Sequence, residues 1–329
     1  VIMSEHRRIG CSLGPLLSMD EVLKCAKIAD ASQIMHSIWV PESWGRESFA
    51  TLGALSQVTS NVMLGTSIVS IYSRTPATVA MAATTIDMLS SSRVMVGLGA
   101  STGAIVENWH GTRFEKPLAR MREFVRCLKL IVTGERVNFE GQFFKVKNFK
   151  ILHAPPRKDI PVLVGAVNPR MVSLASELAD GVILYLRPLD ELRETVQKLR
   201  RNTNDNQFEV ACSIICAVSD SEPELARSRA AQTLAFYVAV GKYYRAFLSE
   251  SGFSSEASAI LEAYSHGGAE AAGKCVSERM LQSLTICGTR EECSKALSRF
   301  EAAGITLPII QFNPVGSTES SFRELLSTF

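Results

Sequence analysis

The sequence of 329 residues predicts an α/β fold, a (β/α)8 TIM barrel in one domain that spans residues 1–329. Three observations favour this fold class. Eight short segments are almost wholly apolar, which is typical of parallel strands covered on both faces. Segments with helical apolar spacing separate most of them, as crossover connections require. The first strand-to-helix turn, Gly14 to Ser18, lacks the glycine fingerprint of an open doubly wound sheet, which favours a closed barrel.

The eight strands are expected where apolar runs end at turn residues. They are residues 8–13, 37–40, 62–68, 93–98, 161–165, 181–186, 208–218 and 305–312. The last run contains Pro308, which predicts an edge strand or a bulge because proline cannot donate to a strand ladder.

The helices are expected where apolar residues recur three and four positions apart. In the first helix these residues are Val22, Leu23, Ala26 and Ala29. The expected helices are residues 19–31, 49–58, 77–89, 118–132, 169–178, 189–200, a helix that begins near 223, 289–303 and 322–329. Thr289, with Glu292 three residues later, forms a capping box in sequence.

Two insertions interrupt the alternation. Residues 136–146 alternate with period two around Glu140 and Gly141, which predicts a β-hairpin within an insertion at about 134–150. Residues 232–284 are mostly helical in pattern, with glycine breaks, and predict a helical insertion before the last strand.

Composition limits the classes of partner. A net charge of +2 without a clustered basic face argues against nucleic acid, and no apolar run approaches the ~18 residues of a membrane span. The N-terminal VIMSEHRRIG lacks the apolar core of a signal peptide. The eight cysteines are scattered, mostly in apolar patterns, so we interpret them as reduced core residues. We therefore expect a cytoplasmic protein that acts on a small molecule.

A metal site is not expected. Cys212 and Cys216 are four residues apart, but they lie in a predicted strand and no other cysteine or histidine pair supplements them.

Carboxylates are few in the loops that follow the strands, where barrel enzymes place their chemistry. Glu42 ends the second strand, and Glu107 lies after the fourth, near His110. These two glutamates are the candidate acids or bases, although an isolated loop glutamate is more often a solvated charge.

A second candidate site is the turn between the fifth strand and its helix. Gly165, Ala166, Val167 and Asn168 precede Pro169, a residue favoured at the first helical position. Free N–H groups at such a helix start bind phosphate, and Arg187 at the end of the next strand would add a cation. The simpler interpretation is an ordinary strand–helix turn.

Several segments resemble the luciferase-like superfamily, which includes flavin-dependent monooxygenases and deazaflavin (coenzyme F-420) oxidoreductases. GAVNPRMVSLASELADGVIL at 165–184 resembles its phosphate loop, usually Gly-Ala-x-Gly-Pro. Further similar segments are GTRFEKPLARMREFVRCLKLIVTGERVNFEGQFFKV at 111–146, YYRAFLSESGF at 243–253 and GTREECSKALSRFEAAGI at 288–305. Together these segments cover most of the chain in the family's order.

The resemblance implies a cofactor bound across the strand ends. Its ring would lie near strands two to four, and its phosphate tail would reach Gly165–Pro169 with Arg187 nearby. GTSIVSIYSRTP at 65–76 looks most like the deazaflavin branch that includes methylenetetrahydromethanopterin reductases. In that branch a cis peptide bond ends the third strand, and the matching bond here joins Ser67 and Ile68. The remaining cofactor-binding candidates are Ser12, Gly99 and Ser101.

The chain also departs from the family. Ser43 and Trp44 stand in the segment where the dehydrogenases carry a histidine, and Thr102 stands where they carry a glutamate. Ser12 replaces the glutamate of the reductases, and Asn168 replaces the glycine of the phosphate loop. The cofactor class is therefore better supported than any catalytic acid.

Our leading hypothesis is a coenzyme F-420-dependent oxidoreductase that moves hydride to or from a small organic substrate, with a pterin-bound one-carbon unit as one option. An FMN-dependent monooxygenase and a non-catalytic flavin-binding barrel are the alternatives. Trp44, Tyr72 and Trp109 are the candidate substrate-pocket residues, and the family implies a homodimer.

Overall fold

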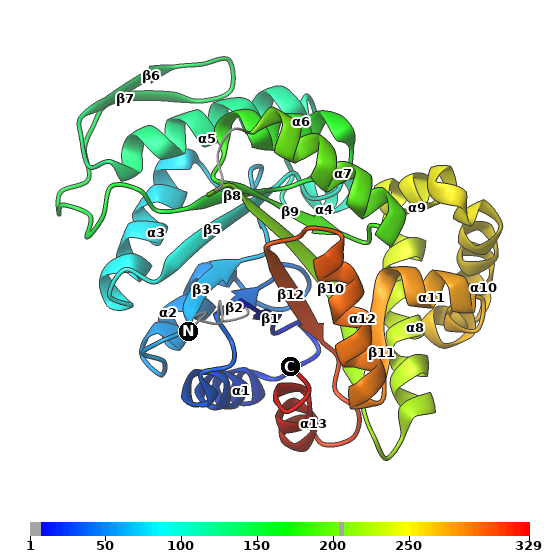
Figure 1. The fold of residues 1–329 in the computed structure, drawn as a ribbon. Coiled ribbons are helices and arrows are strands. Elements are labelled where there is room, and N and C mark those ends of the chain that lie inside the picture. The colour runs from blue at the N-terminus through cyan, green and yellow to red at the C-terminus, as the bar shows by residue number, and fades with distance from the viewer. Residues whose placement is uncertain (1–7, 204–206) are drawn as a thin grey trace.

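The computed structural model describes residues 8–203 and 207–329, and in these residues eight parallel strands close into a barrel (Figure 1). The barrel strands are β1 (Gly10–Ser12), β2 (Ser37–Val40), β3 (Met63–Thr66), β5 (Val94–Gly99), β8 (Val162–Gly165), β9 (Gly181–Tyr185), β10 (Glu209–Val218) and β12 (Leu307–Phe312). They pair in chain order, and β12 closes the ring by pairing with both β10 and β1. The predicted (β/α)8 barrel is confirmed.

The residue Pro308 does not produce the expected edge or bulge. It is the second residue of β12, which pairs without a register shift on one side with β10 and on the other with β1. A closed barrel has no edge strand, so the proline stands near the start of a strand that is paired on both sides.

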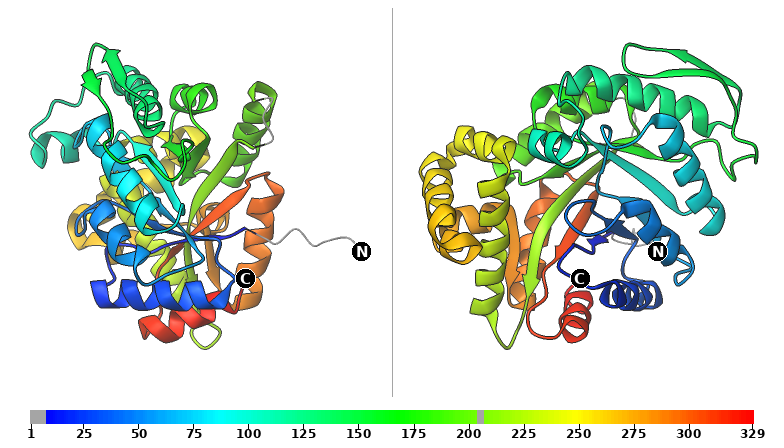
Figure 2. Two further views of the ribbon diagram at one scale, coloured as in Figure 1. Left: turned by 90° about the vertical axis from the view of Figure 1, so that its left-hand side faces the viewer. Right: turned by 180° about the vertical axis from the view of Figure 1, so that it is seen from behind.

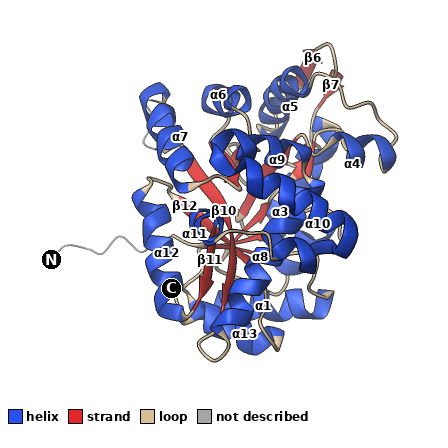
Figure 3. Cartoon of the chain, turned by 90° about the vertical axis from the view of Figure 1, so that its right-hand side faces the viewer, coloured by secondary structure: helices blue, strands red, loops and turns tan. Residues whose placement is uncertain are grey.

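Helices surround the strands (Figure 3). They are α1 (Met19–Ser32), α2 (Ser48–Ser56), α3 (Pro76–Leu89), α5 (Pro117–Val132), α6 (Pro169–Leu178), α7 (Leu189–Asn202), α8 (Pro223–Val240), α12 (Arg290–Ala302) and α13 (Thr318–Leu326). The capping box predicted at Thr289 and Glu292 is present. The last helix begins four residues earlier than predicted because Ser317 caps it, accepting from the N–H of Ser320.

Both insertions are present. The hairpin of β6 (Val137–Glu140) and β7 (Lys145–Phe149) projects beyond α5 (Figure 2), where Glu123 of α5 accepts hydrogen bonds from its turn. The helical insertion continues from α8 into α9 (Lys242–Leu248), the π-helical turn η1 (Ser249–Phe253), α10 (Ser254–Gly273) and α11 (Glu278–Leu284). Two of the predicted breaks, Gly252 and Gly268, have positive φ angles, 86° and 64°.

Three short elements were not predicted. They are β4 (Val69–Ser70), α4 (Gly103–Asn108) and β11 (Thr285–Gly288), which extends the sheet beside β10. Each has six residues or fewer, too few to show a period in sequence.

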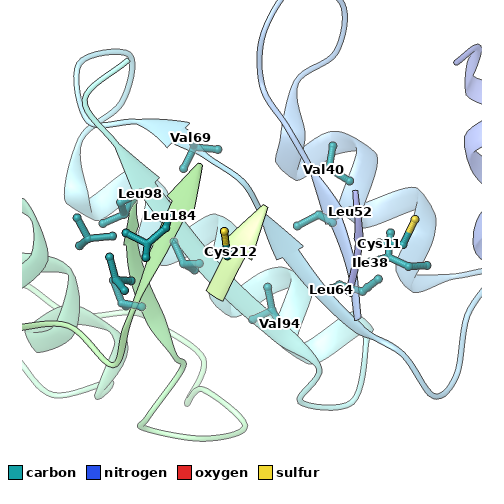
Figure 4. Packing of buried hydrophobic residues seen from close by; sticks show 14 of the residues in the cluster. Cys11, Ile38, Val40, Leu52, Leu64, Val69, Val94, Leu98, Leu184 and Cys212 are labelled. Atoms are coloured by element: carbon teal, nitrogen blue, oxygen red, sulfur yellow. The ribbon is translucent and has the colours of Figure 1, made fainter. Parts of the chain in front are cut away.

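The core has separate layers. Outward-facing strand residues such as Ile38, Leu64 and Leu98 pack beneath the helices (Figure 4), and the helical insertion has an apolar cluster of its own. Inside the barrel lie Trp39, Met95, Leu163, Ile183, Ala211, Leu307 and Ile309. Trp39 is fully buried, and Gly10 and Gly65 face it: a Cβ on Gly65 would lie 2.4 Å from the indole ring.

The described residues contain no disulfide bond and no group of three or more histidine, cysteine, aspartate or glutamate side chains that could hold a metal ion. Within the same ranges, no helix is both long and apolar enough to cross a membrane.

We expect Gly65→Ala to lower the free energy of unfolding by about 1–3 kcal/mol, because the added methyl group would overlap the buried indole of Trp39. Gly53→Ala in α2 is the matched control, since its Cβ would lie 3.6 Å from Ile86 and alanine favours a helix. Urea denaturation followed by circular dichroism measures both. Equal stability of the two variants would contradict the packing.

Candidate active site

Small and polar side chains form a layer at the carboxyl ends of the barrel strands. Side chains alternate along a strand, so positions two or four residues beyond an inward-facing residue face inward again. This layer, here called the floor layer, consists of Ser12, Gly99, Gly165, Tyr185, Ser213 and Gln311. The Tyr185 hydroxyl donates to Oε1 of Gln311 at 2.7 Å, a bond that passes across β10 because Tyr185 lies on β9 and Gln311 on β12.

The end of the third strand has the geometry that the family resemblance implied. The peptide bond between Ser67 and Ile68 is cis, and the chain continues into β4, which pairs with β5. A Cβ on Gly99 would lie 2.5 Å from Cδ1 of Ile68, and one on Gly165 would lie 3.1 Å from its Cγ2. The fold thus brings Ile68 together with these two glycines from neighbouring strands. Ser101, two residues after Gly99, is partly exposed and has a φ of 62°.

The turn between β8 and α6 starts the helix as predicted. Asn168 is the N-cap, and its side chain accepts from the N–H of Met171 at 2.9 Å, while Pro169 is the first helical residue. Within the described residues, the backbone N–H groups of Val167, Asn168 and Arg170 have no protein acceptor. Ala166, by contrast, is buried and donates to the carbonyl of Ile183. The start of α6 therefore offers free donors to an anion.

Arg187 reaches this turn but in a different way from the one predicted. Its side chain is 4% exposed, and its Nη2 donates to the carbonyl oxygen of Val167. Its Nη1 donates to Thr195, and the guanidinium stacks at 4.5 Å from the ring centre of Phe247 in α9. Burial lowers the pKa of Arg187. Its Nε is buried and has no hydrogen-bond partner within the described residues. Arg187 therefore mainly braces the loop.

Glu42 is engaged in an ion pair. The two carboxylate oxygens accept from Nη1 and Nη2 of Arg74, each at 2.6 Å, and the two side chains are 16% and 15% exposed. Arg74 also pairs with Glu47, and Glu42 accepts from the N–H of Ser48 at 3.1 Å. Although burial opposes it, the hydrogen bond and charge of Glu42 raise the pKa of Arg74. The pair ties the loop after β2 to the loop after β4 and leaves Glu42 poorly placed to exchange a proton.

Glu107 lies on α4 and is exposed, and its carboxylate accepts from the N–H of Phe114 at 3.2 Å. Tyr72 is buried, donates to the carbonyl of Glu115 at 2.7 Å and packs under Arg120, whose guanidinium lies 4.7 Å from its ring centre. Burial raises the pKa of Tyr72. These contacts give Glu107 and Tyr72 roles in shaping the loop 109–116 around Phe114, which stacks on Tyr72.

Trp44 and Trp109 come together at the mouth of the barrel. They make an edge-to-face contact with 6.0 Å between ring centroids, and each is about half exposed, 47% and 49%. Phe236 of α8, which the sequence analysis did not single out, contacts Trp44 at 5.2 Å. We call Trp44, Trp109 and Phe236 the aromatic wall. Exposed aromatic groups of this kind commonly mark a binding surface.

We expect Glu42→Gln to lower the free energy of unfolding by about 1–3 kcal/mol, because it removes one partner of a largely buried bidentate ion pair. Glu140→Gln, which breaks the exposed pair with Lys145, should leave stability unchanged. Thermal and urea unfolding measure the difference. An unchanged stability of Glu42→Gln would contradict the structural role given to the pair.

Curated relatives of similar length share this sequence pattern. A Mycobacterium tuberculosis protein provisionally named a coenzyme F-420-dependent oxidoreductase is 28% identical over 301 residues, which cover 83% of this chain and 86% of the relative. The 5,10-methylenetetrahydromethanopterin reductase of Archaeoglobus fulgidus is 26% identical over 328 residues, which cover 97% of each chain.

Solved structures share the fold. The coenzyme F-420-dependent tetrahydromethanopterin reductase of Methanopyrus kandleri superposes with a TM-score of 0.86 at 20% identity and 97% coverage of both chains. A monooxygenase of Streptomyces bottropensis gives a TM-score of 0.75 at 19% identity and 98% coverage of both. A model of the luciferase-like monooxygenase family matches residues 6–307. The chain therefore belongs to the luciferase-like monooxygenase family.

Proposed function

We propose that the protein is a coenzyme F-420-dependent oxidoreductase that transfers hydride between the deazaflavin and a small organic substrate. The observation that carries this proposal is the bulge after β3, where Ile68 lies against Gly99 and Gly165 of the neighbouring strands. The sequence resemblance to the deazaflavin branch implied such a bulge. The two F-420-linked relatives, at 26–28% identity, support the same cofactor class.

The residues present suit such a cofactor. The N–H groups of Val167, Asn168 and Arg170 would hold its phosphate, aided by the positive end of the α6 dipole. Gly99 and Gly165 have no Cβ that would collide with Ile68, so the bulge can pack closely against both strands. In that position it can support a flat ring. When bound there, a deazaflavin supplies or accepts a hydride.

The role of the protein in this proposal is to orient the cofactor and the substrate for hydride transfer. The Glu42–Arg74 pair holds the loops after β2 and β4 in one arrangement, and Arg187 fixes the carbonyl of Val167 in the phosphate turn. The aromatic wall would stack a planar ring and exclude water from its face. Hydride transfer depends on such alignment of donor and acceptor, and a strong acid is not required for every acceptor. A substrate with a conjugated ring, such as a pterin that carries a one-carbon unit, fits this description.

An FMN-dependent monooxygenase is the alternative. The phosphate turn would also suit FMN, and the monooxygenase of similar fold supports this option. Oxygen consumption with reduced FMN would favour it.

The deciding experiment is a titration of the purified protein with coenzyme F-420 and with FMN, followed by absorbance. We expect saturable binding of F-420 that is tighter than that of FMN. Binding of FMN without binding of F-420 would refute the choice of cofactor.

We expect Asn168→Asp to weaken F-420 binding about tenfold or more, because it places a negative charge beside the proposed phosphate while it keeps a good N-cap. Asn168→Ser, an uncharged N-cap, should bind within a few fold of wild type. The same absorbance titration measures both variants. Equal weakening by serine and aspartate would show that the charge at this position does not affect binding. The phosphate would then have to bind at a different place.

A further inference from the structure

Tyr185 and Gln311 of the floor layer meet a second tyrosine, Tyr237, which comes from α8. Besides its 2.7 Å bond to Gln311, Tyr185 makes edge-to-face contacts with Tyr237 of α8 at 5.3 Å and Tyr244 of α9 at 5.5 Å between ring centroids. The side chains of Tyr185 and Gln311 lie beside the Tyr237 hydroxyl and favour a lower pKa for it, against the effect of burial. All three polar side chains remain partly exposed. We call Tyr185, Tyr237 and Gln311 the tyrosine–glutamine cluster.

Hydrogen bonds of Asn313 hold the cluster in place. Asn313 Nδ2 donates to the backbone carbonyl of Gln311 at 2.9 Å, and its Oδ1 accepts from Thr233 of α8 at 2.9 Å. One more α8 residue, Phe236, precedes Tyr237 and belongs to the aromatic wall. The helix α8 is therefore anchored to β12, and it supplies neighbouring residues to the wall and to the floor layer.

The floor layer otherwise lacks a proton donor of any strength. Of its six residues, two are glycines, two are serines and none carries a carboxylate, an imidazole or an amine. Glu42 is paired with Arg74, and Glu107 is an exposed residue of α4. A substrate bound between the aromatic wall and the floor layer thus meets tyrosine hydroxyls as its acidic groups.

We propose that Tyr237 is the proton donor of the reaction, and that Tyr185 and Gln311 position it. This inference rests on the proposed hydride-transfer function. It names the acceptor as a carbonyl or neutral imine group of a small organic molecule.

The reaction balances without a further reagent. When bound, the reduced deazaflavin would supply a hydride to the carbon of the acceptor, and the electron pair of the C=O or C=N π bond would move to the heteroatom. That atom takes the proton of Tyr237, whose O–H bond breaks to leave a phenolate. The single hydroxyl proton of Tyr185 goes to Oε1 of Gln311, so the phenolate is stabilised by the side-chain amide N–H of Gln311. Water returns the proton after product leaves. Burial raises the pKa of Tyr237, and the neighbouring Tyr185 and Gln311 oppose the rise.

The test compares two acceptors on the enzyme loaded with reduced F-420. Cyclohexanone needs a proton, whereas N-methyl-1-pyrrolinium is already a cation and needs none. We expect Tyr237→Phe to lower kcat for cyclohexanone about 100-fold or more and to leave kcat for the pyrrolinium salt within about twofold. Tyr244→Phe is the matched control: it removes a hydroxyl from a ring that also packs on Tyr185, and both rates should be preserved.

A second readout needs no turnover. Quenching of tryptophan fluorescence follows cyclohexanone binding to the unloaded protein, and Tyr237→Phe should weaken this binding about 2- to 10-fold through the lost hydrogen bond. Absorbance titration should show unchanged F-420 affinity in the variant.

Equal loss of kcat for both acceptors, or no loss for cyclohexanone, would overturn the assignment of Tyr237. A wild-type enzyme that binds F-420 yet neither binds nor reduces cyclohexanone would overturn it as well. Failure of the wild-type protein to bind any deazaflavin would refute the proposed function, and the inference would fall with it.

Discussion

The indole of Trp39 in the middle of the barrel is the constraint on which the site depends. Its Nε1 donates to Ser37 at 2.9 Å, and its ring occupies the space beside Gly10 and Gly65, where a methyl group would overlap it. A barrel of eight strands is just wide enough to be filled by side chains. With the middle filled by one large ring, the floor layer is closed from below. A ligand can therefore approach it only from the carboxyl ends of the strands.

Much of the architecture was predictable because the barrel strands are continuous apolar runs and the helices begin at clear caps and prolines. The turn proposed to bind phosphate, residues 165–168, was predictable for the same reason: Pro169 marks the first residue of α6, so the residues before it had to form the loop. The direction of a side chain is a different matter. Arg187 stands at the predicted strand end, but its guanidinium turns to the carbonyl of Val167 because Thr195 and Phe247 enclose it. The direction of the Arg187 guanidinium is therefore set by contacts that form only in the folded chain.

The cis bond and the tyrosine–glutamine cluster were beyond the reach of pattern analysis for different reasons. No propensity distinguishes Ser67 and Ile68 as a cis pair, so that expectation came from family resemblance alone. Tyr185 and Gln311 are 126 positions apart and meet only because the barrel closes. Phe236 and Tyr237 lie in an apolar helical run whose contacts depend on where the insertion docks. Contacts between segments that are distant in the chain leave no pattern in the local sequence.

The helical insertion contacts three parts of the site. Phe236 completes the aromatic wall, Tyr237 reaches the floor layer, and Phe247 stacks on the arginine that braces the phosphate turn. Consecutive residues on a helix point about 100° apart, so one helix can serve a wall and a floor at the same time. A shift of the insertion would therefore move the proposed substrate contacts and the cofactor turn together. Such a shift would matter for the proposed proton transfer because the floor layer carries no charged acid. A tyrosine is a weak acid and transfers its proton effectively only when the acceptor atom lies within hydrogen-bond distance of its hydroxyl. In the proposed reaction, the positioning of α8 takes the place of acid strength.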